Sequence, residues 1–180
     1  MSQSRPPPLP VNNMKIELMQ PFINSADAVL AEVLQCQTRI GDVNMEEEGY
    51  RRKGVAAQVE IKGDIEGRVI FDMDPTTALN VAGYLAGGAG VEHSEGLVEE
   101  TILEIANMVI GNAITALNDG GFQFKISPPA LHTGDSGLTT NEDTEALVMC
   151  FDTTRGSLYM NIALHYNRRR KSERAAVVAD

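Results

Sequence analysis

The stretch Glu95–Asn118 constrains the fold most, because its apolar residues recur at helical spacing over about six turns. They cover a wide arc of the predicted helix: Ile102, Leu103, Ile105, Val109, Ile110, Ala113, Ala116 and Leu117. A helix with so broad an apolar arc is mostly buried against other parts of the chain. Ser94 is expected to cap its start, and Gly120-Gly121 to end it.

Strands are expected to supply the surface on which this helix packs. Val55–Lys62 alternates apolar and polar residues with the period of a half-buried strand. Further strands are predicted at Thr38–Met45, Arg68–Met73 and Phe122–Ile126, with a hairpin of Glu145–Phe151 and Ser157–Tyr166 that turns at Thr153–Gly156. Leu158, Met160, Ile162 and Leu164 form the predicted buried face of that hairpin. Thr133–Asn141 is expected to be a loop.

Two more helices are predicted. The first spans Pro21–Gln35 and carries Pro21 in its first turn, a position where proline is tolerated. The second is short; it opens at Asp74-Pro75, a typical cap followed by proline, and ends at Gly87-Gly88.

The order of these elements is nearly duplicated, since a helix and three strands occur in each half of the chain. Shifting the first helix forward by 83 positions aligns Leu34 with Leu117 and Asn24 with Asn107. The expected fold class is α/β of the α+β kind: pseudo-duplicated helix–three-strand units forming an antiparallel-rich sheet with two long helices packed on it. One domain is expected over residues 14–166, between a disordered Pro-rich leader (1–13) and a disordered basic tail (167–180).

Composition excludes several classes of protein. No apolar run approaches the roughly 20 residues of a membrane helix, and the first ten residues do not resemble a secretory signal. A formal net charge of −10 disfavours non-specific nucleic-acid binding, although the tail contains Arg168–Lys171. Cys36 and Cys150 stand alone and are predicted to be free buried thiols in a reducing compartment. We therefore expect a cytoplasmic protein with no membrane or nucleic-acid partner.

One polar stripe runs along the long helix opposite its apolar arc. At about 100° per residue, Glu104, Asn107 and Gly111 lie within about 40° of Glu100, and Asn118 falls on the same line. A solvated face and a functional surface both fit this spacing. Gly111 is unusual there, because glycine inside a helix costs about 1 kcal/mol relative to alanine. Close approach of a partner backbone would explain it, and so would packing within the chain.

Other chemistries have little support. The three histidines, His93, His132 and His165, are far apart and none has HExxH spacing, so no metal of the chain's own is expected. No serine lies in a GxSxG motif. The run Glu46–Glu48 is most simply a solvated turn, because it lacks the alternating ligands and central glycine of a calcium loop.

The sequence Glu104-Ile105-Ala106-Asn107 within such a helix, with Pro128-Pro129 beyond the next strand, resembles the CheC/CheX/FliY family of chemotaxis phosphatases. Pro21-Phe22-Ile23 and the strand Gly67–Phe71 add to the similarity, which covers roughly residues 14–166. The CheX branch is the nearest, because the first helix has Pro21 where the repeat would place a glutamate, leaving one site.

This resemblance implies a phosphatase for the aspartyl phosphate of a CheY-type response-regulator receiver domain, acting as a homodimer. It implies that Asn107 orients the attacking water and that Glu104 pairs with a lysine of the receiver. Glu100 and Gly111 would contribute to docking. The receiver would supply the Mg²⁺ ion. A non-catalytic receiver-binding or scaffold domain of the same fold remains the alternative.

Overall fold

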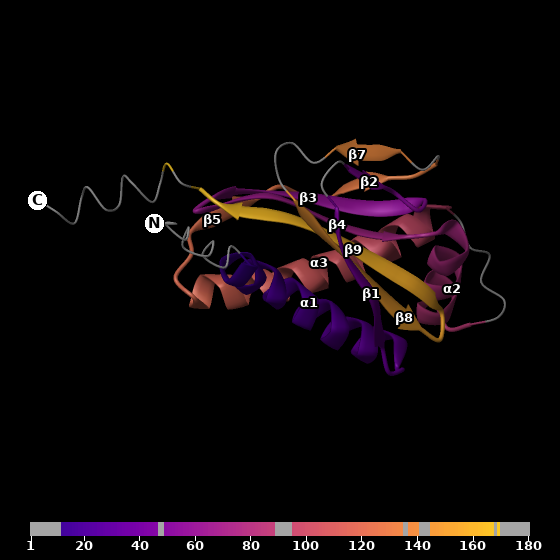
Figure 1. The fold of residues 1–180 in the computed structure, drawn as a ribbon. Coiled ribbons are helices and arrows are strands. Elements are labelled where there is room, and N and C mark those ends of the chain that lie inside the picture. The colour runs from indigo at the N-terminus through magenta and orange to yellow at the C-terminus, as the bar shows by residue number, and fades with distance from the viewer. Residues whose placement is uncertain are drawn as a thin grey trace, which may run out of the picture.

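The computed structural model describes residues 12–46, 49–88, 95–134, 137–140, 145–167 and 169. Three helices occur in this part of the chain: α1 (Asn12–Leu34), α2 (Pro75–Leu85) and α3 (Glu95–Asp119). The strands are β1 (Arg39–Glu46), β2 (Gly49–Arg51), β3 (Val55–Gly63), β4 (Ile65–Met73), β5 (Phe124–Ile126), β6 (Ala130–His132), β7 (Leu138–Thr140), β8 (Ala146–Thr153) and β9 (Gly156–Tyr166). Figure 1 shows the long helices under one face of the main sheet and the β2–β7 ribbon over the other.

The main sheet has the order β1-β8-β9-β4-β3-β5, with β6 also pairing with β3, and every pairing in it is antiparallel. From the central pair β4–β9, the order outward is β3 and then β5/β6 on one side, and β8 and then β1 on the other. The two halves of the chain are therefore arranged with approximate two-fold symmetry, and β2 and β7, at matching places in the halves, pair with each other. This confirms the expected α+β class with its antiparallel sheet.

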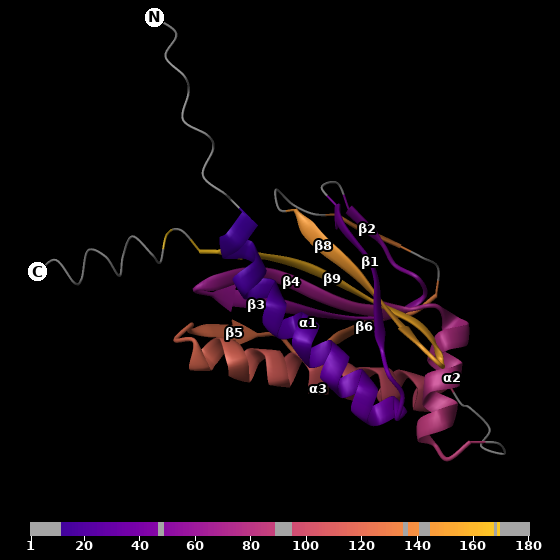
Figure 2. The same cartoon turned by 60° about the horizontal axis from the view of Figure 1, so that its bottom comes forward.

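The core lies between the sheet and the two long helices, which run in opposite directions beside each other (Figures 1 and 2). The predicted buried face of the hairpin is confirmed, because Leu158, Met160, Ile162 and Leu164 are all fully buried. The helices are also joined by a hydrogen bond of 2.6 Å from Ser25 Oγ to the carbonyl oxygen of Val109. This bond lies in the interior and fixes the position of α1 along α3.

The first helix begins nine residues earlier than expected, so Pro21 lies inside α1 rather than in its first turn. An interior proline removes a backbone hydrogen bond and costs about 3 kcal/mol. The added turns bury Leu18 and Met19, which are 0% and 2% exposed. Burying two such side chains contributes roughly 1.5–3 kcal/mol each, which offsets that cost.

Three short strands were not predicted. β7 lies within the segment expected to be a loop, and β2 and β6 also have only three residues, too few for an alternating pattern. The β2 residue Tyr50 is 1% exposed and packs with Ala56, Ile70 and Val148 on the outer face of the sheet. Ala56 was expected on the polar side of a half-buried strand, but it is fully buried beneath this ribbon.

The predicted start of α2 is confirmed. Asp74 Oδ1 accepts a hydrogen bond of 2.8 Å from the backbone N–H of Thr77, and Pro75 occupies the first turn. α3 ends at Asp119, just before Gly120, and Gly121 adopts a φ of +87° there.

The proposed cap Ser94 lies outside the described residues, as do His93, residues 1–11 and most of the basic tail.

Two further expectations about burial are wrong. Cys36 and Cys150 are free thiols but only partly buried. Ala116, which was placed on the apolar arc of the long helix, is exposed, whereas its neighbour Leu117 is 3% exposed and lies in the core. No helix in the described part of the chain is both long and apolar enough to cross a membrane.

Candidate functional site

The polar stripe of α3 faces outward along most of the helix. Glu100, Glu104, Asn107 and Gly111 are all exposed, and so is Asn118. The opposite side of the helix is buried, with exposures of 0–2% at Ile102, Ile105, Val109 and Ala113. The separation of the two faces thus follows the spacing in the sequence, and none of the stripe residues belongs to the core.

Glu104 and Asn107 have no hydrogen-bonding or ionic partner among the described residues. They lie three positions apart on an α-helix, which separates them by about 4.5 Å along the axis and keeps them on one face. The Ser25–Val109 hydrogen bond joins α1 to the buried side of α3 and helps to fix which way the stripe points. A carboxylate and a carboxamide are therefore held side by side on a rigid element, with their polar atoms available to a group from outside the chain.

Gly111 has open space around it. A methyl group at the position of its missing Cβ would meet no other atom within 4 Å. Packing within the described part of the chain therefore does not explain this glycine. The other interpretation, close approach by the backbone of a partner, stays a prediction.

The matching position on α1 differs from α3 in both residues. Pro21 stands at the place of Glu104, and Asn24 at the place of Asn107 under the 83-residue shift. Asn24 is exposed, but its Oδ1 already accepts a hydrogen bond of 2.7 Å from Gln20 Nε2. Within the described residues, the unpartnered pair of carboxylate and carboxamide is found on α3 and is missing from the equivalent face of α1.

A second polar region lies on the opposite face of the sheet, where sequence reasoning did not place one. Asp72 is fully buried on β4; its Oδ2 accepts hydrogen bonds of 2.9 Å from the Tyr50 hydroxyl and 2.6 Å from the Lys53 backbone N–H. The signal was a single aspartate within the otherwise apolar run Val69–Met73, because such a residue, once buried, requires hydrogen-bond donors.

Burial controls the ionisation of this region. It raises the pKa of Asp72, and the hydrogen bonds from Lys53 and Tyr50 oppose that change. The pKa of Tyr50 is raised well above its usual range, first by burial and then by the negative charge of Asp72. Burial also lowers the pKa of Arg68, whose guanidinium donates a hydrogen bond to Asn161 on the same face.

No group of three or more histidine, cysteine, aspartate or glutamate side chains with metal-binding geometry occurs in the ranges that the structure describes. His132 and His165 lie on different strands, β6 and β9. Neither region described above offers a ready set of metal ligands.

Comparison with known proteins defines the family to which this fold belongs. The family model for the chemotaxis phosphatase CheX matches residues 55–152, more than half of the chain. The chain is a member of the CheX family. It is 25% identical over 121 residues to the CheY-P phosphatase CheX of Thermotoga maritima. This alignment covers 67% of this chain and 78% of that protein.

Solved structures agree with this assignment. The CheX of a CheX–CheY–BeF₃–Mg²⁺ complex from Borrelia burgdorferi is 31% identical, with a TM-score of 0.69 over 83% of this chain and 99% of that one. A CheX from Desulfovibrio desulfuricans has the same fold, with a TM-score of 0.72 and 21% identity over 84% of this chain and all of that one. The predicted resemblance to the CheC/CheX/FliY proteins is confirmed.

Proposed function

We propose that this protein is a cytoplasmic phosphatase that hydrolyses the aspartyl phosphate of a CheY-type receiver domain. The observation that carries the proposal is the exposed, unpartnered pair Glu104 and Asn107 on one face of α3. Membership of the CheX family and the Borrelia complex with CheY support the choice of substrate. The proposal assigns the chemical step to Asn107 and the docking step to Glu104.

Hydrolysis of an acyl phosphate needs a water molecule in line with the phosphorus and neutralisation of the charge on the equatorial oxygens. A carboxamide suits the first task, because it both donates and accepts hydrogen bonds and does not titrate. Asn107 therefore orients the water in this proposal. The Borrelia complex contains Mg²⁺ together with CheY, so we assign the cation to the receiver rather than to this chain.

Glu104 lies one turn before Asn107 and would pair with a lysine of the receiver, fixing the register in which the two proteins meet. Glu100 adds a second carboxylate on the same line. Gly111, with nothing around its missing Cβ, leaves room for the receiver backbone to approach the helix. In this proposal the stripe combines two carboxylates for docking, one amide that positions the water, and one glycine that leaves space for the receiver backbone.

The test is the decay of a phosphorylated CheY-type receiver with and without this protein. Asn107→Ala should bind the receiver almost normally but lose about 10²–10³ in turnover, the usual effect of deleting one preorganised polar group. Glu104→Lys should chiefly weaken association, because it places a like charge opposite the receiver lysine. Asn112→Ala is the matched control, since Asn112 is exposed on α3 but lies away from the stripe.

Parental turnover by Asn107→Ala would show that the role of Asn107 is wrong. If the parent bound the phosphorylated receiver without accelerating its decay, the scaffold alternative would replace the phosphatase. All of these variants should melt within a few degrees of the parent, because each changes an exposed residue.

We also propose that the protein forms a homodimer through β1. This strand is at the edge of the main sheet, and exposed edges are normally covered or protected by charge. Here Ile40, Val43 and Met45 are 44%, 50% and 49% exposed on it. Light scattering at micromolar concentration should report about twice 19.5 kDa, and Val43→Lys should shift the protein toward the monomer. A parent that gave only the 19.5 kDa species would rule the dimer out.

A further inference from the structure

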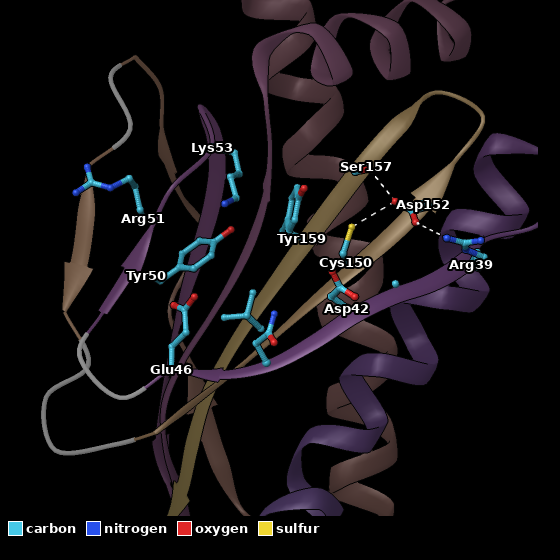
Figure 3. Close-up of a pocket in the computed structure, with 13 residues that line it drawn as sticks. Arg39, Asp42, Glu46, Tyr50, Arg51, Lys53, Cys150, Asp152, Ser157 and Tyr159 are labelled. Carbon is cyan, nitrogen blue, oxygen red and sulfur yellow. Dashed lines mark hydrogen bonds and ion pairs between the residues drawn. The ribbon is translucent and has the colours of Figure 1, made fainter.

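The outer face of the sheet contains a cavity of about 440 Å³, a size within the range of small-molecule sites. Its floor is formed by β8 and β9, one wall by β1, and the other by β2 and the segment that follows it. Figure 3 shows Tyr50, Lys53 and Tyr159 close together on one side, and Asp42, Cys150 and Asp152 on the other. The α3 stripe is on the opposite face of the sheet, so this cavity lies outside the proposed catalytic site (Figure 1).

Charge in the cavity is divided between the walls. The lining includes three basic side chains, Arg39, Arg51 and Lys53, and three acidic ones, Asp42, Glu46 and Asp152. It is therefore balanced overall, which disfavours a ligand with a large net charge. The basic residues Arg51 and Lys53 belong to the β2 side, whereas Asp42 and Glu46 belong to β1.

One of the acidic groups is already engaged inside the cavity. Asp152 accepts a hydrogen bond of 2.8 Å from the Ser157 hydroxyl and one of 3.4 Å from the Cys150 thiol. The guanidinium of Arg39 lies 3.7 Å from its other oxygen. Arg39 and Asp152 thus already form an exposed ion pair, so a charged ligand has to find its partners among the other lining residues.

Lys53 and Asp42 are suited to that task. The Lys53 ammonium lies 4.9 Å from the centre of the Tyr159 ring and 5.8 Å from that of Tyr50, and no carboxylate oxygen of the described residues lies within 4 Å of it. Tyrosine faces attract a cation but leave its hydrogen-bond donors available. Asp42 is exposed on the opposite wall and has no ionic partner in the described part of the chain.

The wall that carries Lys53 is held rigidly from below. The buried carboxylate of Asp72 binds both the Lys53 backbone and the Tyr50 hydroxyl, so residues on either side of the β2 end are fixed to the sheet. A fixed wall lowers the entropy lost when a ligand binds, which favours binding of even a small molecule.

We propose that this cavity binds a small zwitterionic molecule of net charge near zero, such as an amino acid, with Lys53 binding its carboxylate and Asp42 binding its ammonium group. The partly buried ring of Tyr159 provides a surface for the part of the ligand between the charges. The proposal does not depend on the phosphatase assignment, because it uses no residue of α3.

Protein-observed NMR titrations of the full chain at pH 7 test this with three probes of increasing length: glycine, 4-aminobutyrate and 6-aminohexanoate. Butyrate and butylamine are the matched molecules that carry one charge each. We expect at least one zwitterion to bind about tenfold more tightly than either single-charge analogue, with shifts centred on Val148, Cys150 and Tyr159. Equal binding of all five probes, or no saturable shift from any zwitterion, would overturn the proposal.

Variants of the two charged residues sharpen the test. Lys53→Met should lower the affinity for the zwitterion about tenfold and leave that for butylamine unchanged. Asp42→Asn should also lower the affinity for the zwitterion about tenfold and leave the affinity for butyrate unchanged. Both residues are exposed, so melting temperatures should stay close to the parent. Lys62→Met removes an exposed lysine of β3 outside the cavity and serves as the control; an equal loss there would also contradict the proposal.

Discussion

Replacing Gly111 with alanine should make the protein more stable and less active. Gly111 is an exposed interior residue of α3, and an added Cβ meets nothing within 4 Å. The substitution therefore brings no clash, and it gains the difference in helix propensity of about 1 kcal/mol. For a chain of this size, a gain of about 1 kcal/mol raises the melting temperature by roughly 2–4 °C.

The effect on function should have the opposite sign. If the backbone of a receiver approaches α3 at this point, a methyl group there pushes the two apart, and the amide of Asn107 one turn earlier no longer reaches its water. We expect at least a tenfold loss in receiver dephosphorylation by Gly111→Ala. Thermal unfolding and the decay of a phosphorylated receiver, measured on the same preparation, give both quantities.

Ala116→Gly is the matched control, because it makes the reverse change at an exposed position on the same helix, about 140° away from Gly111 around the axis. It should lower the melting temperature by a similar amount and leave dephosphorylation unchanged below the transition. A more stable Gly111→Ala with full activity would refute the docking role of Gly111. A Gly111→Ala variant that is less stable than the parent would refute the interpretation that Gly111 lies in a helix with free space around it.

Two further predictions concern stability. Pro21→Ala should stabilise the protein by about 2 kcal/mol in urea unfolding, because it restores a backbone hydrogen bond inside α1; no gain would mean that α1 is adapted to the proline. Asp72→Asn should become more stable relative to the parent as the pH rises. Because the pKa of Asp72 is raised, its own contribution to stability is complete below about pH 4 and decreases as the folded-state carboxyl ionises, whereas asparagine does not titrate. Urea unfolding at about pH 4.5 and pH 8 measures this, and a constant or shrinking difference would contradict it.

Long periodic segments allowed most of the fold to be predicted. α3 and the β8–β9 hairpin were placed within a residue or two, because each repeats its pattern over many residues and the pattern matches which face is buried. Proline is favoured in the first turn of a helix, so the sequence predicts that α1 begins at Pro21. The helix begins earlier because its added turns bury Leu18 and Met19. That burial depends on the sheet and α3, which the local sequence does not contain.

The outer face of the sheet was predicted least well, and for a related reason. β2 and β7 are three residues each, and they are strands only because they pair with one another across about 90 residues of chain. Once they are in place, they cover Ala56 and enclose Asp72, so the burial of both depends on a long-range pairing. The α3 stripe, by contrast, is set by helical spacing alone, and its exposure followed from the sequence.

The approximate two-fold symmetry of the sheet makes the difference between the two long helices informative. The scaffold supports α1 and α3 in equivalent ways, so nothing in the architecture alone restricts a site to one of them. The restriction comes from side chains: Pro21 takes the place of a carboxylate, and Gln20 occupies the oxygen of Asn24. On α3 the equivalent groups, Glu104 and Asn107, have no partner in the described part of the chain. A surface that maintains two unpartnered polar groups on a rigid helix, opposite a well-packed core, gains nothing in folding from them. Both groups are therefore available to another molecule, which supports the proposal of a single site on α3.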